Sequence, residues 1–318
     1  MIKAIFLILL TTSFAISGFA DDGADEEVEE EAVVGENPEK IELFSVITEL
    51  PATGWKSLQM GFSKESLPYW GLIIGSTALL YEYDEDIYAD TQKNGRKWGI
   101  GNGDNTHALF EIGPWPVRFP TDAGSAMYFL GDGITHFTIA GSMIGYGYFS
   151  ENNRAYNTGL QIVHGMTVST VFSQILKRAT GRESPYVKTQ EQGAWRPFPS
   201  ISEYANNTPS YDAMPSGHVM TATMTFTVLI DNYPEYEYWL RPLEVTWVTL
   251  LGWQMVNNGV HWASDYPLGI ALGYVCGKTA SQLGKKEKTQ ESSDDSYSWS
   301  VMPVYKNGMM TTQLVVSF

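Results

Sequence analysis

Residues 215–218 have the sequence PSGH, and residues 261–265 have the sequence HWASD. The chain has only five histidines, and two of them lie in these stretches. Ser216 followed by a glycine is typical of a helix start, where unpaired backbone amides attract anions. Asp265 follows His261 by one helical turn, so the two side chains can face each other. Together the two stretches predict helix boundaries that carry phosphate chemistry.

The residue types in these stretches predict separate roles in cleavage of a phosphate ester. His261 suits the nucleophile, because Asp265 can accept the proton on one ring nitrogen and direct the other nitrogen outward. His218 suits the general acid that protonates the leaving oxygen. The predicted phosphate-binding groups are Lys177, Ser216 and the backbone of Gly217.

Each of these features also has a simpler explanation. A carboxylate one turn after a histidine is often a surface ion pair, a serine before a helix is often only a cap, and a lysine at a helix end often only complements the helix dipole. Their common placement at helix boundaries favours a single site.

The motifs together resemble those of the type 2 phosphatidic acid phosphatase superfamily, which includes class A acid phosphatases and vanadium haloperoxidases. That superfamily has the signature Lys-x6-Arg-Pro, Pro-Ser-Gly-His and Ser-Arg-x5-His-x3-Asp. The second part is complete at residues 215–218, the third is present at His261 and Asp265, and the first at Lys177 and Pro185. The resemblance covers approximately residues 66–283.

The resemblance implies an all-α fold, a six-helix bundle, to which this chain adds a short C-terminal β-hairpin. It also implies that His261 forms a phosphohistidine, that His218 protonates the leaving group and that Asp265 orients His261. No cofactor and no metal are expected for hydrolysis. Vanadate would be a cofactor only for a haloperoxidase.

Two arginines of the signature are missing, because their positions hold Ser184 and Met255. A hydrogen bond to a charged group is worth about 1.5–3 kcal/mol. Loss of both would therefore cost about a hundredfold to ten-thousandfold in rate without replacement. We expect Arg182, together with Arg196, to supply part of the missing phosphate clamp.

Composition along the chain predicts five segments. They are a signal peptide (1–20), an acidic disordered tail (21–40), a helical phosphatase-like domain (41–284), a polar linker (285–296) and a β-hairpin (297–318). Hydrophobic periodicity predicts helices over residues 66–81, 125–149, 157–177, 216–230, 238–256 and 263–283. An Asn-Gly pair between two alternating segments predicts the hairpin.

The net charge of −16 disfavours nucleic acid and anionic lipid surfaces as main partners. The signal peptide predicts an exported, periplasmic protein. Mean hydropathy is only −0.16, which favours a bundle that does not span a membrane, while association with a membrane remains open.

The leading interpretation is an exported phosphatase that hydrolyses phosphate monoesters, either a lipid phosphate or a small phosphoester. The alternative is a non-catalytic phosphate- or lipid-binding relative, which the missing arginines favour. A vanadate-dependent haloperoxidase ranks third, because it needs tight binding of vanadate, which the missing arginines disfavour.

Overall fold

The computed structural model describes residues 37–113, 115–285, 298–306 and 309–317. The chain divides into two compact units, residues 1–284 and 285–318. The first unit contains all the motifs assigned to phosphate chemistry. The predicted signal peptide, nearly all of the acidic tail and residues 286–296 of the predicted linker lie outside the described residues.

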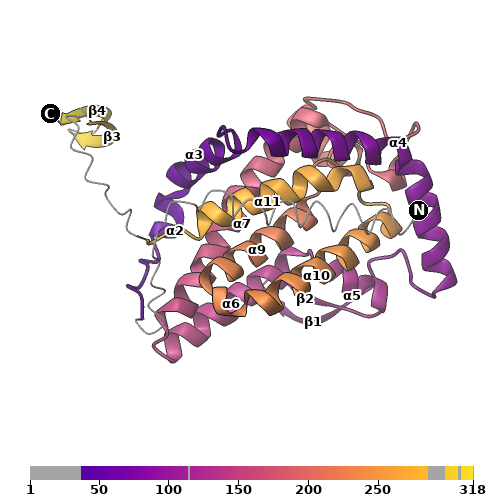
Figure 1. Ribbon diagram of the computed structural model, residues 1–318, viewed down its shortest axis with the longest axis horizontal. Helices are drawn as coiled ribbons and strands as arrows, with labels where there is room; N and C mark the ends of the chain where they lie inside the picture. Colours follow the sequence, from indigo (N-terminus) through magenta and orange to yellow (C-terminus); the bar gives the residue numbers. More distant parts are fainter. Residues whose placement is uncertain (1–36, 114, 286–297, 307–308, 318) are drawn as a thin grey trace. The chain divides into compact units, whose positions relative to one another are not determined.

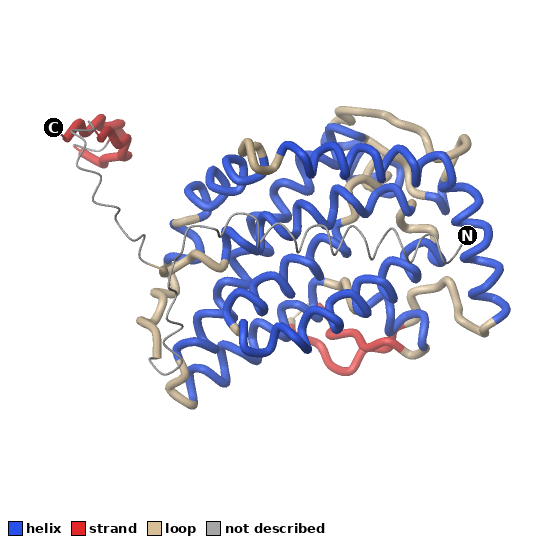
Figure 2. Tube along the Cα trace, viewed as in Figure 1, coloured by secondary structure: helices blue, strands red, loops and turns tan. Residues whose placement is uncertain are grey.

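The first unit is mostly helical, with one pair of strands (Figures 1 and 2). Its helices are α2 (Ser45–Thr48), α3 (Leu50–Gly61), α4 (Leu67–Lys97), α5 (Ala123–Phe129), α6 (Gly133–Phe149), α7 (Asn153–Thr180), α8 (Ile201–Asn206), α9 (Gly217–Asn232), α10 (Glu237–Asn258) and α11 (Tyr266–Ala280). Single 3-10 turns include Pro185–Val187 and Ala263–Asp265. None of the described helices is both long enough and apolar enough to cross a membrane.

All six predicted helical segments fall on helices, but two differ in extent. The segment predicted to end at residue 81 continues to Lys97, because its buried stripe persists through Leu80, Asp84, Ile87 and Thr91 at helical spacing. The segment predicted over residues 125–149 is two helices. Asp132 starts the second, since its carboxylate accepts a hydrogen bond from the amide of Ile134 at 2.8 Å.

A pair of strands interrupts the helices and was not predicted. Strand β1 (Thr106–Ile112) pairs with β2 (Trp115–Pro120) in antiparallel register, directly after the glycine-rich turns at 99–105. The second unit contains β3 (Ser298–Lys306) and β4 (Met309–Ser317), also antiparallel. These two strands correspond to the C-terminal hairpin expected from the sequence.

Helix α9 lies at the centre of the first unit and packs against α7, α10 and α11 (Figure 1). Its first turn is approached closely by α11, because a Cβ atom on Gly269 would lie only 2.8 Å from the carbonyl oxygen of Ser216. Another glycine, Gly131, admits His218, because a Cβ on Gly131 would lie 2.7 Å from the Cβ of His218. Small residues therefore enclose the start of α9.

We expect Gly269→Ala to destabilise the protein by about 1–3 kcal/mol, because the added methyl group meets backbone that cannot move aside. Gly75→Ala on α4 is the matched control, since a Cβ there has no neighbour within 4 Å. The control should be neutral or gain about 0.5–1 kcal/mol from better helix propensity. Urea unfolding of both variants measures the difference, and equal effects would contradict the close approach.

Candidate active site

The two histidine motifs meet at the start of α9. The rings of His218 and His261 are 5.7 Å apart between centroids and nearly perpendicular. Gly259 ends α10 with a left-handed φ of 75°, which turns the chain back toward α9 two residues before His261. The amide of Ser216 donates to the carbonyl of Asp265 at 3.1 Å, so one motif is hydrogen-bonded to the other.

His261 is held with one ring nitrogen free. Its Nδ1 lies 2.6 Å from the carbonyl oxygen of Ala213, which can only accept a hydrogen bond, so Nδ1 carries the hydrogen. Its Nε2 is buried and has no hydrogen-bond partner among the described residues. Burial and, next, the positive charge of Lys177 lower the pKa of His261 to about 3. The ring is therefore neutral, with a lone pair available on Nε2.

Asp265 lies beside His261, but its oxygens are committed elsewhere. The distance from Nδ1 of His261 to Oδ2 of Asp265 is 3.7 Å, too long for a hydrogen bond. Oδ2 accepts from the amide of Trp262 at 2.7 Å, and Oδ1 from Arg182 at 2.6 Å. The carbonyl of Ala213 therefore takes the hydrogen-bonding role that the sequence assigned to Asp265.

The first turn of α9 forms a potential anion site. Ser216 caps the helix by accepting from the amide of Val219, while the amides of Gly217 and His218 have no helical partner, as in any first turn. A Cβ on Gly217 would lie 3.7 Å from Nζ of Lys177, so the ammonium group reaches this turn. Lys177 and the helix N-terminus together suit a phosphate.

His218 is half-buried and lies between the second histidine and an aromatic ring. The ring of Tyr128 contacts it with centroids 5.0 Å apart. Burial, followed by electrostatic interactions with His261 and Lys177, lowers the pKa of His218 well below its usual value. As a general acid it needs a proton, which an arriving phosphate dianion would favour.

Arg182 does not reach the phosphate site as expected. It is fully buried, and both Nη atoms are saturated: Nη1 donates to Asp265 (2.6 Å) and Ser264 (2.7 Å), and Nη2 donates to Asp84 (2.7 Å) and the carbonyl of Gln192 (3.1 Å). An arginine held between two carboxylates cannot also clamp a phosphate through these donors. The clamp hypothesis for Arg182 is therefore corrected to a structural role.

Arg196 is also engaged away from the histidines. Its guanidinium donates to Glu183 at 3.2 Å and to Thr189 at 2.8 Å, within its own loop. The two positions that lack the signature arginines are buried, Ser184 at 1% exposure and Met255 at 0%. Met255 packs in the main hydrophobic core, so no charged group replaces the missing arginine there.

Asp84 belongs to this site but escaped the sequence analysis. It comes from α4 and accepts hydrogen bonds from Arg182 and from the amide and hydroxyl of Ser264. Burial raises the pKa of Asp84 and that of Asp265 to about 6, against the opposing charge of Arg182. The available signal was a carboxylate on the buried stripe of an amphipathic helix, where an unpaired charge would be costly.

Asp212 is the second residue that was missed. Its Oδ2 lies 3.4 Å from Nζ of Lys177, and it directly precedes the Ala213 whose carbonyl binds His261. The site therefore contains a carboxylate paired with the lysine that should bind the phosphate.

The other buried histidines have structural settings. His164 is bonded to the carbonyl of Val46 and the hydroxyl of Thr53, both at 2.8 Å, and His136 to the carbonyl of Leu130 at 3.0 Å. Over the described part of the chain, no group of three or more His, Cys, Asp or Glu side chains is arranged to hold a metal ion. Hydrolysis without a metal stays a prediction.

Two histidines and a lysine lie around a helix N-terminus in this unit. This arrangement is typical of sites that transfer phosphoryl groups. Residues 158–288 match the model of the PAP2 superfamily, which confirms the resemblance drawn from the motifs. This match supports a phosphatase-like function.

One solved structure, a transmembrane PAP2 type phosphatidylglycerolphosphate phosphatase from Bacillus subtilis, is similar to this chain. The identity is 14%, the TM-score is 0.44, and the match covers 78% of this chain and 99% of that one. No curated protein sequence matches the chain.

We expect Arg182→Met to lower the free energy of unfolding by about 3–5 kcal/mol, because it leaves two buried carboxylates without their counter-ion. Arg154→Met is the matched control, since Arg154 pairs with Glu235 at a partly exposed site. Such a pair is worth about 1 kcal/mol or less. Urea denaturation at neutral pH measures both, and a loss at Arg182 no larger than at Arg154 would contradict the buried bridge.

Proposed function

We propose that the protein is a phosphatase that hydrolyses phosphate monoesters through a phosphohistidine on His261. The observation that carries this proposal is the free, buried Nε2 of His261, whose opposite nitrogen is held by a backbone carbonyl. A neutral imidazole with a fixed tautomer is suited to nucleophilic attack. The adjacent lysine and helix N-terminus supply positive charge for the phosphate.

The reaction has two steps that the geometry can support. The lone pair of His261 Nε2 attacks phosphorus, the bond to the leaving oxygen breaks, and His218 gives that oxygen a proton. Water then attacks the phosphohistidine, with His218 accepting a proton, and releases inorganic phosphate and the free imidazole. Lys177 and the amides of Gly217 and His218 would stabilise the charge on the phosphate oxygens in both steps.

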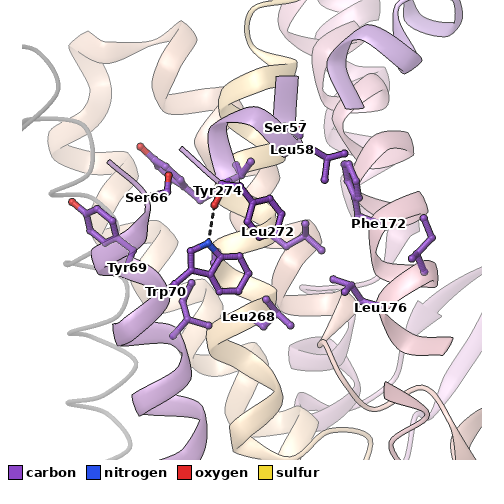
Figure 3. Close-up of a pocket in the computed structure, with 16 residues that line it drawn as sticks. Ser57, Leu58, Ser66, Tyr69, Trp70, Phe172, Leu176, Leu268, Leu272 and Tyr274 are labelled. Atoms are coloured by element: carbon purple, nitrogen blue, oxygen red, sulfur yellow. Dashed lines mark hydrogen bonds between the residues drawn. The ribbon is translucent and has the colours of Figure 1, made fainter. Parts of the chain in front are cut away.

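An apolar cavity favours a lipid phosphate over a small phosphoester. It has a volume of about 520 Å³ and lies between α3, α4, α7 and α11 (Figure 3). The labelled side chains of Trp70, Leu268, Leu272 and Phe172 surround it, and Trp70 is fixed by a hydrogen bond to the carbonyl of Gly61 at 2.8 Å. Such a lining would accept a hydrocarbon chain.

A second cavity, of about 480 Å³, extends from the first toward the catalytic motifs. It shares Trp70, Ile73 and Leu268 with the first cavity, so the two adjoin. It is also lined by Met214, the residue before the PSGH motif. A chain lying in both cavities would place its polar end near the start of α9.

Exposed apolar side chains support contact with a membrane surface. Trp55 and Phe62 on and after α3 and Ile74 on α4 are more than 60% exposed, on the helices that border the apolar cavity. An apolar surface beside a lipid-sized cavity would admit a substrate directly from a bilayer. We retain export to the periplasm as part of this proposal.

The alternative, a non-catalytic relative, is favoured by the pairing of Lys177 with Asp212 and by the absence of the signature arginines. Measured turnover separates the two proposals. Bromide oxidation with added vanadate would instead favour a haloperoxidase.

The first test is hydrolysis of p-nitrophenyl phosphate and phosphatidic acid by wild type and His261→Ala. We expect the variant to lose essentially all activity. Wild type quenched with denaturant at alkaline pH should carry an acid-labile phosphate on His261 that mass spectrometry detects. Because the pKa of His218 is lowered, fewer molecules hold the needed proton as pH rises, while the low pKa of His261 keeps the nucleophile neutral in acid. kcat/KM, which reports the free enzyme, should therefore fall as pH rises, and the fall should begin below the ordinary histidine pKa of about 6.5.

His164→Asn is the control for this assay, since His164 lies in the core away from the motifs. Equal activity of wild type and His261→Ala on every ester would contradict the phosphatase proposal. It would support the alternative, a non-catalytic phosphate- or lipid-binding protein.

The second test narrows the apolar cavity with Ala271→Phe. Ala271 lines the cavity, so the larger ring should reduce kcat/KM for a long-chain phosphatidic acid by about tenfold or more, equivalent to 1.4 kcal/mol of lost contact. Activity on p-nitrophenyl phosphate should be retained. Ala205→Phe, on the exposed side of α8, is the matched control. A parallel loss on both substrates in Ala271→Phe would argue against a chain-binding cavity.

A further inference from the structure

The carboxylate of Asp212 is the more exposed partner of the Lys177 ion pair. Its side chain is 26% exposed, whereas that of its partner Lys177 is 10% exposed and that of His261 is 2% exposed. Asp212 is thus the more solvent-accessible member of the pair. In a displacement on phosphorus, the attacking and leaving atoms are in line. A leaving group therefore departs on the side away from the buried His261, and Asp212 is a partly exposed carboxylate of the same site.

The charges of the site are balanced before any substrate binds. Lys177 contributes one positive charge, Asp212 one negative charge, and the two histidines are neutral. A phosphate monoester brings roughly −1.5 to −2. Arg182 is buried and already forms ion pairs with Asp84 and Asp265. An ordinary anionic ester must therefore displace Asp212 from Lys177 and then lie beside an unpaired carboxylate.

Two tyrosines neighbour the histidine motifs. Tyr128 contacts the ring of His218, and the backbone amide of Tyr186 donates to the carbonyl of Gly259 at 3.0 Å, two residues before His261. Tyr186 is 54% exposed. Burial raises the pKa of Tyr186, and the negative charge of Asp212 raises it further, which is consistent with their proximity. A carboxylate beside aromatic faces is a typical environment for an ammonium group.

We propose that Asp212 is a specificity-determining residue that selects phosphate monoesters of amino alcohols, whose ammonium group it binds on the leaving-group side. The ammonium replaces Lys177 as the partner of Asp212, and Lys177 turns to the phosphate. When the phosphorus–oxygen bond breaks and His218 protonates the leaving oxygen, the amino alcohol departs with its positive charge. Asp212 then pairs with Lys177 again. This inference rests on the proposed phosphatase function.

The test compares O-phosphoethanolamine with n-propyl phosphate, in which a methyl group replaces the ammonium group. Both are assayed with full-length wild type, Asp212→Asn and Asp231→Asn. Asp231 is the matched control, because it pairs with a lysine, Lys278, at 2.9 Å on the α9–α11 contact away from the motifs. The ratio of kcat/KM for the two esters is measured at constant ionic strength, together with Kd by calorimetry.

We expect wild type and Asp231→Asn to prefer O-phosphoethanolamine by about tenfold, or 1.4 kcal/mol. Asp212→Asn should bring the ratio close to one, by weakening the amino ester and improving the propyl ester. A ratio near one in wild type, or an unchanged preference in Asp212→Asn, would overturn the inference.

The proposed function is judged separately, from p-nitrophenyl phosphate and His261→Ala. If wild type cleaves no ester, the phosphatase proposal fails while the Kd ratio still decides the role of Asp212. If p-nitrophenyl phosphate is cleaved and both ratios are near one, only the specificity proposal fails.

Discussion

The buried bridge of Asp84, Arg182 and Asp265 holds together the parts of the chain that form the candidate active site. One guanidinium joins α4, the loop after α7 and the turn before α11 through hydrogen bonds of 2.6–2.7 Å to the two carboxylates. Removing three charges from water is expensive, and the expense is offset only when geometry and hydrogen bonding are nearly complete. Both Nη atoms are fully bonded, so any displacement of these three segments would leave a buried charge unpaired.

The bridge determines where His261 lies without touching it. Asp265 is fixed by Arg182, its carbonyl binds the amide of Ser216, and its Oδ2 caps the turn that follows His261. His261 itself is oriented by the carbonyl of Ala213, and the amide of Ala213 in turn donates to the carbonyl of Arg182 at 3.0 Å. The same arginine thus supports the histidine from two directions, through its side chain and through its backbone.

Because Arg182 pairs with Asp84 and Asp265, the candidate phosphate site is left with little positive charge. Lys177 and the first-turn amides of α9 are the cationic and dipolar groups near His261, and Asp212 offsets the lysine. Transition-state stabilisation depends on preorganised charge, so a site of this kind needs help from its substrate or acts slowly. The low pKa values of both histidines follow from the same environment, in which burial and a nearby lysine disfavour additional protons.

The sequence by itself determined six of the helical segments, because hydrophobic periodicity, caps and glycines act locally, but it missed helix α3. It also determined that His218, His261 and Lys177 belong together, because their motifs are specific. It did not reveal the break at Asp132 or the strands β1 and β2, where local signals compete. Only the tertiary structure decided the partners of Arg182 and Lys177. Asp84 and Asp265 are far apart along the chain, and Asp212 lies in a loop, so no spacing rule connects them. A charged side chain binds whichever opposite charge the fold brings within hydrogen-bond distance, and that choice depends on packing between distant segments.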